Sequence, residues 1–519
     1  MRQRVLAYLS ICITLLFTVG ISCGGGGDEQ VACDPAAQTG CENGQVCEEV
    51  QGGEPGCFEP VSLQASVVDL ETGQPLSGIQ VVALDANGSP ISGICTTGVN
   101  GICTLTVSLT RDANGNTVET IFLRADGAGY LTFPGGARPP FPVSTSGAQV
   151  DANGVLILDP ALTKVALIAL PDPDACQGSI AGTAENPAAD TGVLVVAETT
   201  LAATPCGMDP ETPGFAAGSL HGFTAIADKD SGQYRIFNLP SGSYAVAGYA
   251  KGANYSSDPN PVNISGNQEA AVNLSILDEN TATASGNVEF ANAPNTDESS
   301  VVFIVESTLI QVNTQVVIPD GGGTTVDVPV LLRGESVPGL RQVVTQNASS
   351  FEAEGVPAGN YVVLAGFEND QAVRDPDVCI GGTEVQHITL NPGATETLEG
   401  FKITDALTNP DPDANALVGL NPVFSWDDDS SEEAYYLFLF DGFARKIWEK
   451  KDIPAVSGQS RVSVNYGDGG DPLGGVPLES GQFYQFRVMD IRFPGGGGDT
   501  SKQCPISLTE DFRGVFEVQ

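Results

Sequence analysis

Residues 228–246 read DKDSGQYRIFNLPSGSYAV, and the turns and strands expected in them indicate the fold class. Gly232 closes a turn, because glycine accepts the positive φ that tight turns need. The strand that follows carries Tyr234, whose ring we expect in a hydrophobic core. Residues 240–244, PSGSY, then make the next turn and deliver a second core aromatic, Tyr244. Strands joined by tight turns are the unit of antiparallel sheets.

The rest of the chain has the same β character. Short runs of Val, Ile, Leu, Thr and Tyr alternate with turn dipeptides, and no long segment keeps the 3.6-residue apolar period of a helix. The expected strands include residues 63–68, 79–84, 102–109, 193–197, 301–305 and 483–488. Many short strands about ten residues apart are typical of sandwiches. The predicted fold class is therefore all-β, with β-sandwiches in tandem.

Two parts of the chain repeat at the length of a domain. LPSGSY at 239–244 corresponds to VPAGNY at 356–361, and VLVVAE at 193–198 corresponds to VVFIVE at 301–306. The offsets are 117 and 108 residues, which indicates a repeated domain and not a solenoid. The PDPD segments at 171–174 and 410–413 are typical of semi-rigid linkers.

Residues 228–246 resemble the carboxypeptidase regulatory-like domain, a transthyretin-like sandwich of bacterial surface proteins. Residues 67–84, VVDLETGQPLSGIQVVAL, look like the opening of another such domain. The Pro-x-Gly-x-Tyr element is missing there, so an Ig-like sandwich is the alternative for that module. The resemblance covers about residues 60–405 and implies an accessory domain, not a peptidase.

The C-terminal segment resembles a fibronectin type III domain, on the residues PVFSW at 422–426, YYLFLF at 435–440 and LESGQFYQFRV at 478–488. The resemblance implies a tyrosine corner at Leu478, Gly481 and Tyr484, whose phenol bonds back to the backbone. Ser480 stands where the family usually has proline. Trp426 would be the core tryptophan of an early strand.

The N-terminus has the layout of a secretory signal, with Arg2 and Arg4 before an apolar run over residues 5–19. The run closes on GISC at 20–23, which resembles the bacterial lipobox except that Gly20 stands where Leu is usual. The resemblance implies that Cys23 is diacylated and anchors the chain in a membrane. An ordinary cleavage site, with Cys23 in a disulfide, is the alternative.

We therefore expect seven segments. A signal peptide (1–22) and a Gly-rich tether (23–32) lead to a disulfide-rich knot (33–59). Four sandwiches follow, named here module 1 (60–170), module 2 (171–280), module 3 (281–405) and module 4 (406–519). The residue after the anchor is Gly24 and not Asp, so by analogy with lipoprotein sorting we expect the outer membrane, with surface exposure left open.

The cysteine pattern indicates an oxidising compartment. Of the 12 cysteines, Cys12 leaves with the signal and Cys23 carries lipid, so ten remain. Four of these cluster in the knot, where zinc is the competing interpretation, but no C-x-x-C pair is present. The expected disulfides pair Cys33, Cys41, Cys47 and Cys57 among themselves, clamp a hairpin through Cys95–Cys103, and join Cys176–Cys206 and, by subtraction, Cys379–Cys504.

Charge excludes nucleic acid as a partner. The formal net charge is −42, and losing Arg2 and Arg4 with the signal makes it −44. A field of that sign repels phosphates. We expect no cofactor. Calcium is the alternative, because carboxylates cluster at Asp228–Asp230 and at Asp427–Asp429. Neither cluster is followed by the glutamate that completes an EF-hand loop.

Catalytic chemistry is not expected. His221 and His387 are the only histidines and lie outside any nucleophile or metal motif, and neither G-x-S-x-G nor H-E-x-x-H occurs. We expect a non-enzymatic envelope protein for display, adhesion or scaffolding, with an unknown protein or polysaccharide partner. Carbohydrate binding through an exposed Trp448 is the alternative, and an enzyme with accessory sandwiches is the third class. We expect an elongated chain, because contacts between such modules are small and each sandwich should have its own core. Module 4 would then lie farthest from the membrane.

Overall fold

The computed structural model describes residues 33–35, 38–42, 44–135, 138, 140–146, 148–151, 155–158, 161–185, 192–199, 206, 222–256, 261–290, 298–317, 325–345, 348–367, 386–403, 407–428, 433–456, 460–469, 477–492, 504–509 and 512–519. Regular structure in these residues consists of β-strands, with short 3₁₀ helices at η1 (Pro173–Cys176) and η3 (Glu306–Thr308). The predicted all-β class is therefore confirmed. The described part of the chain holds no helix that is long and apolar enough to span a bilayer. The signal segment and Cys23 lie outside the described residues.

The knot is a small two-stranded unit, in which β1 (Val46–Glu48) pairs antiparallel with β2 (Gly56–Phe58). Disulfides join Cys33 to Cys47 and Cys41 to Cys57. The four cysteines thus pair among themselves, as the sequence predicts. The sulfurs of Cys33, Cys41 and Cys47 lie close enough together to surround a metal ion. Sulfurs bonded in disulfides, however, offer no thiolate to zinc.

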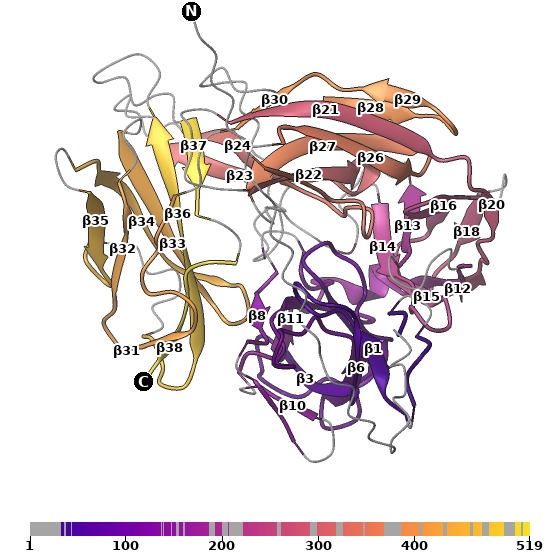
Figure 1. The fold of residues 1–519 in the computed structure, drawn as a ribbon, viewed down its shortest axis with the longest axis horizontal. Coiled ribbons are helices and arrows are strands. Elements are labelled where there is room, and N and C mark those ends of the chain that lie inside the picture. The colour runs from indigo at the N-terminus through magenta and orange to yellow at the C-terminus, as the bar shows by residue number, and fades with distance from the viewer. Residues whose placement is uncertain are drawn as a thin grey trace, which may run out of the picture.

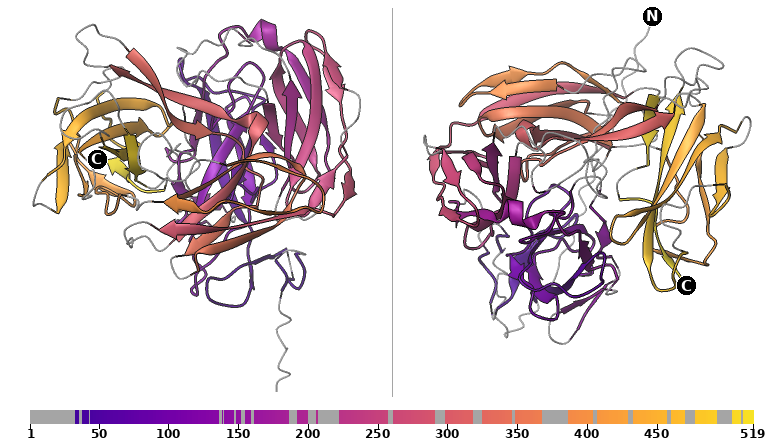
Figure 2. Two further views of the ribbon diagram at one scale, coloured as in Figure 1. Left: turned by 90° about the horizontal axis from the view of Figure 1, so that it is seen from above. Right: turned by 180° about the vertical axis from the view of Figure 1, so that it is seen from behind.

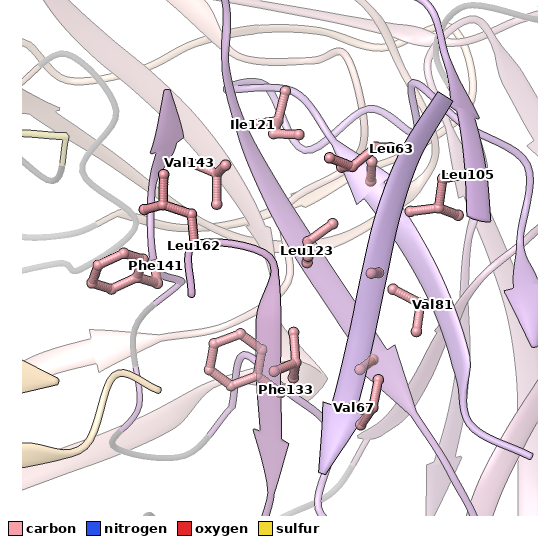
Figure 3. Close-up of a cluster of buried hydrophobic side chains, with 14 of the residues drawn as sticks. Leu63, Val67, Val81, Leu105, Ile121, Leu123, Phe133, Phe141, Val143 and Leu162 are labelled. Atoms are coloured by element: carbon pink, nitrogen blue, oxygen red, sulfur yellow. The ribbon is translucent and has the colours of Figure 1, made fainter. Parts of the chain in front are cut away.

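Module 1 is a sandwich of two sheets. The first is built on β3 (Val61–Asp69), with β6 (Ile102–Val107), β9 (Gln149–Val150), β10 (Val155–Ile157) and β11 (Lys164–Leu167). The second has the order β5 (Cys95–Thr96), β4 (Gln80–Leu84), β7 (Thr120–Asp126) and β8 (Val143–Ser144). Leu63, Leu105, Val81 and Leu123 meet between the sheets (Figure 3).

The Cys95–Cys103 disulfide forms, but it does not clamp a hairpin ladder. Cys95 lies on β5, which pairs with β4, whereas Cys103 lies on β6, which pairs with β3. The turn between the two cysteines therefore crosses from one sheet to the other. The bond consequently staples the two sheets of module 1 together.

Modules 2 and 3 share one topology. In module 2 one sheet has the order β15 (Gln233–Leu239), β12 (Gly178–Thr183), β19 (Glu269–Ala271). The other has the order β14 (Gly222–Ile226), β13 (Leu194–Thr199), β16 (Gly242–Ala250), β17 (Ala253–Tyr255), β20 (Ile276–Asp278), with β18 (Val262–Ile264) on β16.

Module 3 repeats this plan with strands that match those of module 2. One sheet has the order β26 (Ser350–Val356), β21 (Ala282–Phe290), β29 (Thr395–Thr397), with β30 (Phe401–Ile403) on β21. The other has the order β25 (Gln342–Thr345), β22 (Glu298–Val305), β27 (Gly359–Phe367), β28 (Gln386–Leu390). A separate hairpin pairs β23 (Ile310–Val317) with β24 (Thr325–Arg333).

The repeated Pro-x-Gly-x-Tyr element has the same structure in both modules. The Tyr244 hydroxyl donates to the carbonyl of Pro240 at 2.7 Å, and the Tyr361 hydroxyl donates to the carbonyl of Pro357 at 2.7 Å. Both rings are buried in their cores. The tyrosine therefore fills the core with its ring, and its hydroxyl provides a hydrogen bond for the proline carbonyl of the preceding turn. These two roles explain why the element recurs.

Module 4 has a large sheet in the order β31 (Ala416–Val418), β38 (Val515–Val518), β36 (Phe483–Arg492), β33 (Ala434–Asp441), β34 (Lys446–Pro454), with β37 (Cys504–Leu508) on β36. β32 (Val423–Asp427) and β35 (Arg461–Asn465) form the facing pair. Trp426 is buried edge-to-face against Tyr435, at 5.3 Å between ring centroids. The Tyr484 hydroxyl accepts a hydrogen bond from the Glu479 backbone N–H at 2.9 Å, the kind of bond a tyrosine corner makes.

The four modules are arranged around a closed circuit and not along a line. In Figure 1 modules 1, 2 and 3 follow one another around the molecule, and module 4 returns beside module 1. Figure 2 shows the same arrangement from behind and from above. The expectation of an elongated chain is therefore wrong. Its premise, that contacts between modules are small, fails because specific residues hold modules 1, 2 and 3 together and join module 4 to module 1.

Candidate functional site

The most constrained polar site lies where modules 1, 2 and 3 meet, around Arg124 on β7. Its guanidinium donates to Asp126 within module 1 at 2.9 Å and to Glu335 of module 3 at 2.6 Å. It also donates to the hydroxyl and the carbonyl of Thr224, on β14 of module 2. Only 2% of the Arg124 side chain is exposed. The flanking carboxylates hold the pKa of Arg124 above its usual range, against the effect of burial. One buried cation thus ties three modules together.

The joint between modules 1 and 2 depends on Asn238, near the end of β15. Its side chain donates to the carbonyls of Gly127 at 3.0 Å and Tyr130 at 2.7 Å, and accepts from the Gly129 N–H at 2.7 Å. Asn238 has φ 60, a left-handed conformation that asparagine tolerates better than most residues. This backbone conformation directs the side-chain amide of Asn238 toward the loop that follows β7.

A disulfide supports the same joint. Cys176 and Cys206 of module 2 are bonded, as expected, and both are buried against Leu170 and Leu131 of module 1. The backbone carbonyl of Cys206 accepts from the N–H of Asp172 in the PDPD segment. The segment predicted to be a spacer is therefore part of the joint between modules 1 and 2. Asp172 is hydrogen-bonded to Cys206, and the flanking residues Leu170 and Cys176 are buried together.

The first candidate calcium turn also serves this joint. Oδ2 of Asp228 accepts from the Ile94 N–H of module 1 at 2.6 Å, and its Oδ1 accepts from the Ser231 N–H and hydroxyl. These hydrogen bonds lower the pKa of Asp228, against the effect of its partial burial. Asp230 pairs with Lys229 at 2.8 Å. The Asp228 carboxylate is thus occupied by N–H and O–H donors, which a cation would have to displace.

The joint between modules 2 and 3 uses the equivalent position. Gly355 lies 117 residues after Asn238 in the repeat and has φ 78. Its carbonyl accepts from the N–H of Gly252, in the loop after β16, at 2.7 Å. The Asn254 side chain accepts from the Ala358 N–H at 2.8 Å. A Cβ at Gly355 would lie 3.0 Å from the nitrogen of Gly252, so the close approach requires glycine.

The knot meets module 1 in the corresponding place. Arg111, just after β6, forms a buried ion pair with Glu48 at 2.6 Å. Its backbone N–H donates to Glu49, and its carbonyl accepts from Gln51. β6, β15 and β26 occupy the same place in their sheets, beside β3, β12 and β21. In modules 1, 2 and 3, therefore, residues at or just after the end of this strand contact the preceding unit.

The circuit is closed by an apolar contact between modules 4 and 1. Phe122 of β7 lies 5.0 Å from Phe512, measured between ring centroids. Ala444, Phe483 and Val515 of module 4 are part of the buried cluster that contains the core of module 1. The premise that each sandwich has its own core is thus wrong for this pair, because module 4 completes the core of module 1.

Trp448, the proposed sugar contact, is in the core of module 4. Its ring is 1% exposed and packs 6.1 Å from Phe424 and 5.3 Å from Tyr466, between centroids. A register shift in the β33–β34 ladder leaves Ile447 as an extra residue, so Ile447 and Trp448 both point inward. The prediction of an exposed Trp448 is wrong, and the carbohydrate interpretation loses the residue on which it depended.

The remaining candidates are not brought together. Asp427 pairs with Arg461 at 2.7 Å, and Asp428 accepts from the Tyr435 hydroxyl at 2.9 Å, while Asp429 lies outside the described residues. His387 is exposed on β28 and lies 2.7 Å from Glu306. His221 lies outside the described residues.

The expected bond between Cys379 and Cys504 stays a prediction. Cys504 begins β37, but Cys379 lies outside the described residues, in the segment that follows β27. The corresponding segments of modules 1 and 2, after β7 and β16, are the ones that receive the next module.

No family model and no curated protein matches the chain. Among solved structures, the TIE protein of Bacillus anthracis is similar over 68% of this chain and 52% of its own, at 12% identity and a TM-score of 0.14. A DUF3823 family protein of Bacteroides ovatus is similar over 46% of this chain and 100% of its own, at 14% identity and a TM-score of 0.20. Two B repeats of the Staphylococcus aureus collagen-binding protein are similar over 89% of this chain and 100% of their own, at 13% identity and a TM-score of 0.17.

The chain spans about half the length of the TIE protein. TM-scores of this size identify no family for the chain.

Proposed function

We propose that this chain is a non-enzymatic lipoprotein of the cell envelope that presents a closed body of four β-sandwiches for display, adhesion or scaffolding. The observation that carries the proposal is the set of joints. Arg124, Asn238 and Gly355 use polar side chains and backbone groups to fix neighbouring modules. A surface built across fixed modules suits recognition of a large partner, a protein or a polysaccharide, because its geometry is set before binding.

Several features support a role without catalysis. Asp228 and Asp427 begin the two candidate calcium clusters, and both accept hydrogen bonds with a structural role. Asp228 accepts from Ile94 of the neighbouring module, and Asp427 accepts from Arg461 on the paired strand. His387 is exposed beside a single glutamate, without a serine or cysteine among its described hydrogen-bond partners. Nucleophilic catalysis needs a base within hydrogen-bond reach of its nucleophile. Broad hydrolase and transferase screens of the purified chain should therefore be negative.

The anchor is tested by labelling. The wild-type chain should incorporate a labelled fatty acid and partition into detergent, and Cys23→Ala should abolish both. Cys12→Ala is the matched control, since Cys12 lies inside the signal and should leave both unchanged. A wild-type chain that takes up no label, with Cys23 in a disulfide, would overturn the lipoprotein assignment. Fractionation of the two membranes then tests the outer-membrane assignment made from Gly24.

The role is tested on whole cells. Loss of the gene, or replacement by the Cys23→Ala form, should reduce attachment or the recruitment of an envelope partner. Protease added to intact cells distinguishes the two faces of the membrane, because only a surface-exposed body is cleaved. Unchanged attachment and an unchanged envelope proteome in the deletion strain would contradict a display or scaffolding role.

A further inference from the structure

The four cysteines of the knot lie close enough together to exchange partners. Cys33 is bonded to Cys47, and Cys41 is bonded to Cys57. The sulfurs of Cys33, Cys41 and Cys47 all lie within 4.8 Å of one another. The ladder between β1 and β2 places Cys47 directly opposite Cys57. Each cysteine therefore has a second cysteine beside it, in addition to the one to which it is bonded.

The backbone of the knot favours these second pairs. The N–H groups of Asp34 and Thr39 each donate to the carbonyl of the other residue, at 3.3 and 2.9 Å, so the chain turns back on itself between Cys33 and Cys41. Opposite residues of an antiparallel ladder, such as those on β1 and β2, have Cα atoms roughly 4.5–5.5 Å apart, within the range that a disulfide requires. Both second pairs can therefore form without a change in strand register.

A thiol from solution has access to the knot at one end of this group of sulfurs. Cys57 is exposed and Cys41 is half-buried, whereas Cys33 is 7% and Cys47 1% exposed. A disulfide exchanges when a thiolate attacks one of its sulfurs and the other sulfur leaves. A thiolate from solution therefore attacks Cys57, and the sulfur that leaves is that of Cys41, which lies beside the buried bond.

We propose that the knot is a thiol-exchange site, at which a monothiol converts the pairs Cys33–Cys47 and Cys41–Cys57 into Cys33–Cys41 and Cys47–Cys57. The monothiol, as its thiolate, bonds to the sulfur of Cys57, and the Cys41 thiolate leaves. The Cys41 thiolate attacks Cys33, and the Cys47 thiolate leaves. The Cys47 thiolate attacks Cys57 across the ladder and releases the monothiol. Each step breaks one S–S bond and forms another, so the exchange involves no net oxidation or reduction and the monothiol is a catalyst.

The exchange changes how the knot holds the chain that precedes it. Both present bonds fasten residues 33–41 to the hairpin of β1 and β2, which contacts module 1 through the ion pair of Glu48 with Arg111. In the exchanged form neither knot disulfide joins the two segments, and hydrogen bonds such as those between Gln38 and Cys47 hold them together. In a lipid-anchored chain this lengthens the tether. That consequence rests on the proposed function, whereas the exchange itself does not.

Peptide mapping measures the exchange. Cleavage after glutamate divides the knot into peptides 30–42, with Cys33 and Cys41, 43–48, with Cys47, and 55–59, with Cys57. The present pairs link all three peptides into one species. The exchanged pairs leave 30–42 closed on itself and join 43–48 to 55–59. The purified mature chain carrying Cys23→Ala is incubated with 2-mercaptoethanol, quenched in acid and alkylated before digestion, so the result does not depend on the lipid.

We expect the two separate species to appear and to increase with time in the thiol. The Cys95–Cys103 and Cys176–Cys206 bonds are internal controls and should stay intact. Two results would overturn the proposal. One is a knot that keeps its present pairs in the thiol. The other is reduction of the knot, or of the control bonds, without the exchanged species.

Cys57→Ser tests the middle step without added thiol, because it leaves the Cys41 thiol beside the Cys33–Cys47 bond. The thiol should move from Cys41 to Cys47, so a maleimide added after unfolding in mild acid should label peptide 43–48. Cys103→Ser is the matched control, since it leaves Cys95 unpaired in module 1, where the label should stay. Label confined to Cys41, or found on Cys33, would contradict the proposed step.

Discussion

Nη1 of Arg124 in module 1 donates to Oε1 of Glu335 in module 3 at 2.6 Å, across 211 residues of sequence. The same guanidinium reaches Thr224 in module 2. Three sandwiches therefore share one buried cation, and their mutual orientation depends on contacts that no single sandwich could make.

Replacing Arg124 with Met should lower stability by about 2–4 kcal/mol, because Asp126 and Glu335 are left without their cation. The loss stays below that of a fully buried pair, since the Glu335 side chain is 33% exposed. Urea unfolding measures it. Arg235→Met, at an exposed ion pair, is the control and should change stability by less than about 1 kcal/mol. Equal urea midpoints for the two variants would contradict a central role for Arg124.

Two substitutions at Asn238 distinguish the contribution of its left-handed backbone to stability from that of its side-chain hydrogen bonds. Asn238→Gly keeps the left-handed backbone and loses the three side-chain hydrogen bonds to module 1, so we expect a loss of about 1–3 kcal/mol. Asn238→Ala adds roughly 1 kcal/mol, because alanine resists positive φ. In urea unfolding the wild type should be the most stable, Asn238→Gly intermediate and Asn238→Ala the least stable. An Asn238→Gly chain as stable as the wild type would show that these bonds do not hold the joint.

Buried carboxylates predict an unusual dependence on pH. Burial raises the pKa of Glu119, with Thr110 acting against it and the charges of Asp85 and Glu48 adding to it. The folded state therefore holds the proton more tightly than the unfolded state. The stability from protonated Glu119 is complete below the unfolded pKa and is lost as pH rises through the higher folded pKa.

The free energy of unfolding of the wild type should therefore fall between mildly acidic and neutral pH, and the fall should be smaller in Glu119→Gln. Its free energy of unfolding at pH 7 should equal or exceed that of the wild type. Glu352→Gln, at an exposed position on β26, is the control and should keep the wild-type pH profile. A Glu119→Gln chain that is less stable than the wild type at pH 7 would show that the charged form is the one stabilised.

Covalent structure gives a further prediction. Peptide mass spectrometry without reduction should find Cys33–Cys47, Cys41–Cys57, Cys95–Cys103 and Cys176–Cys206. The mature chain should contain no free thiol, and the remaining bond should join Cys379 to Cys504. Alkylation of Cys379 or Cys504 in the native chain would refute that last bond, while the other four serve as internal controls.

Local features of the fold follow from the sequence, because they depend on neighbouring residues. Turn glycines such as Gly232, and the repeated tyrosines Tyr244 and Tyr361, predict strands and cores correctly. The arrangement of modules could not be predicted in the same way. Arg124 in TIFLRAD has the pattern of an ordinary outward-facing charge on a strand, and only the partners in modules 2 and 3 show its role.

The burial of Trp448 could not be predicted from the sequence for a different reason. Charged neighbours in KIWEK are typical of an exposed strand. Alternation along a strand cannot locate a bulge, and the bulge at Ile447 turns two successive side chains inward. For Asn238 a signal was present: an asparagine directly before the Leu-Pro of the turn, where the second repeat has glycine, indicates a position that needs positive φ.

Small-angle X-ray scattering of the mature chain without its lipid tests whether the four modules form one closed body. A compact chain of this length should have a radius of gyration of about 23–26 Å. Four sandwiches joined end to end would exceed about 40 Å. A value near the lower figure is the result we predict, and a value near the higher one, with the profile of a rod, would contradict the closed arrangement.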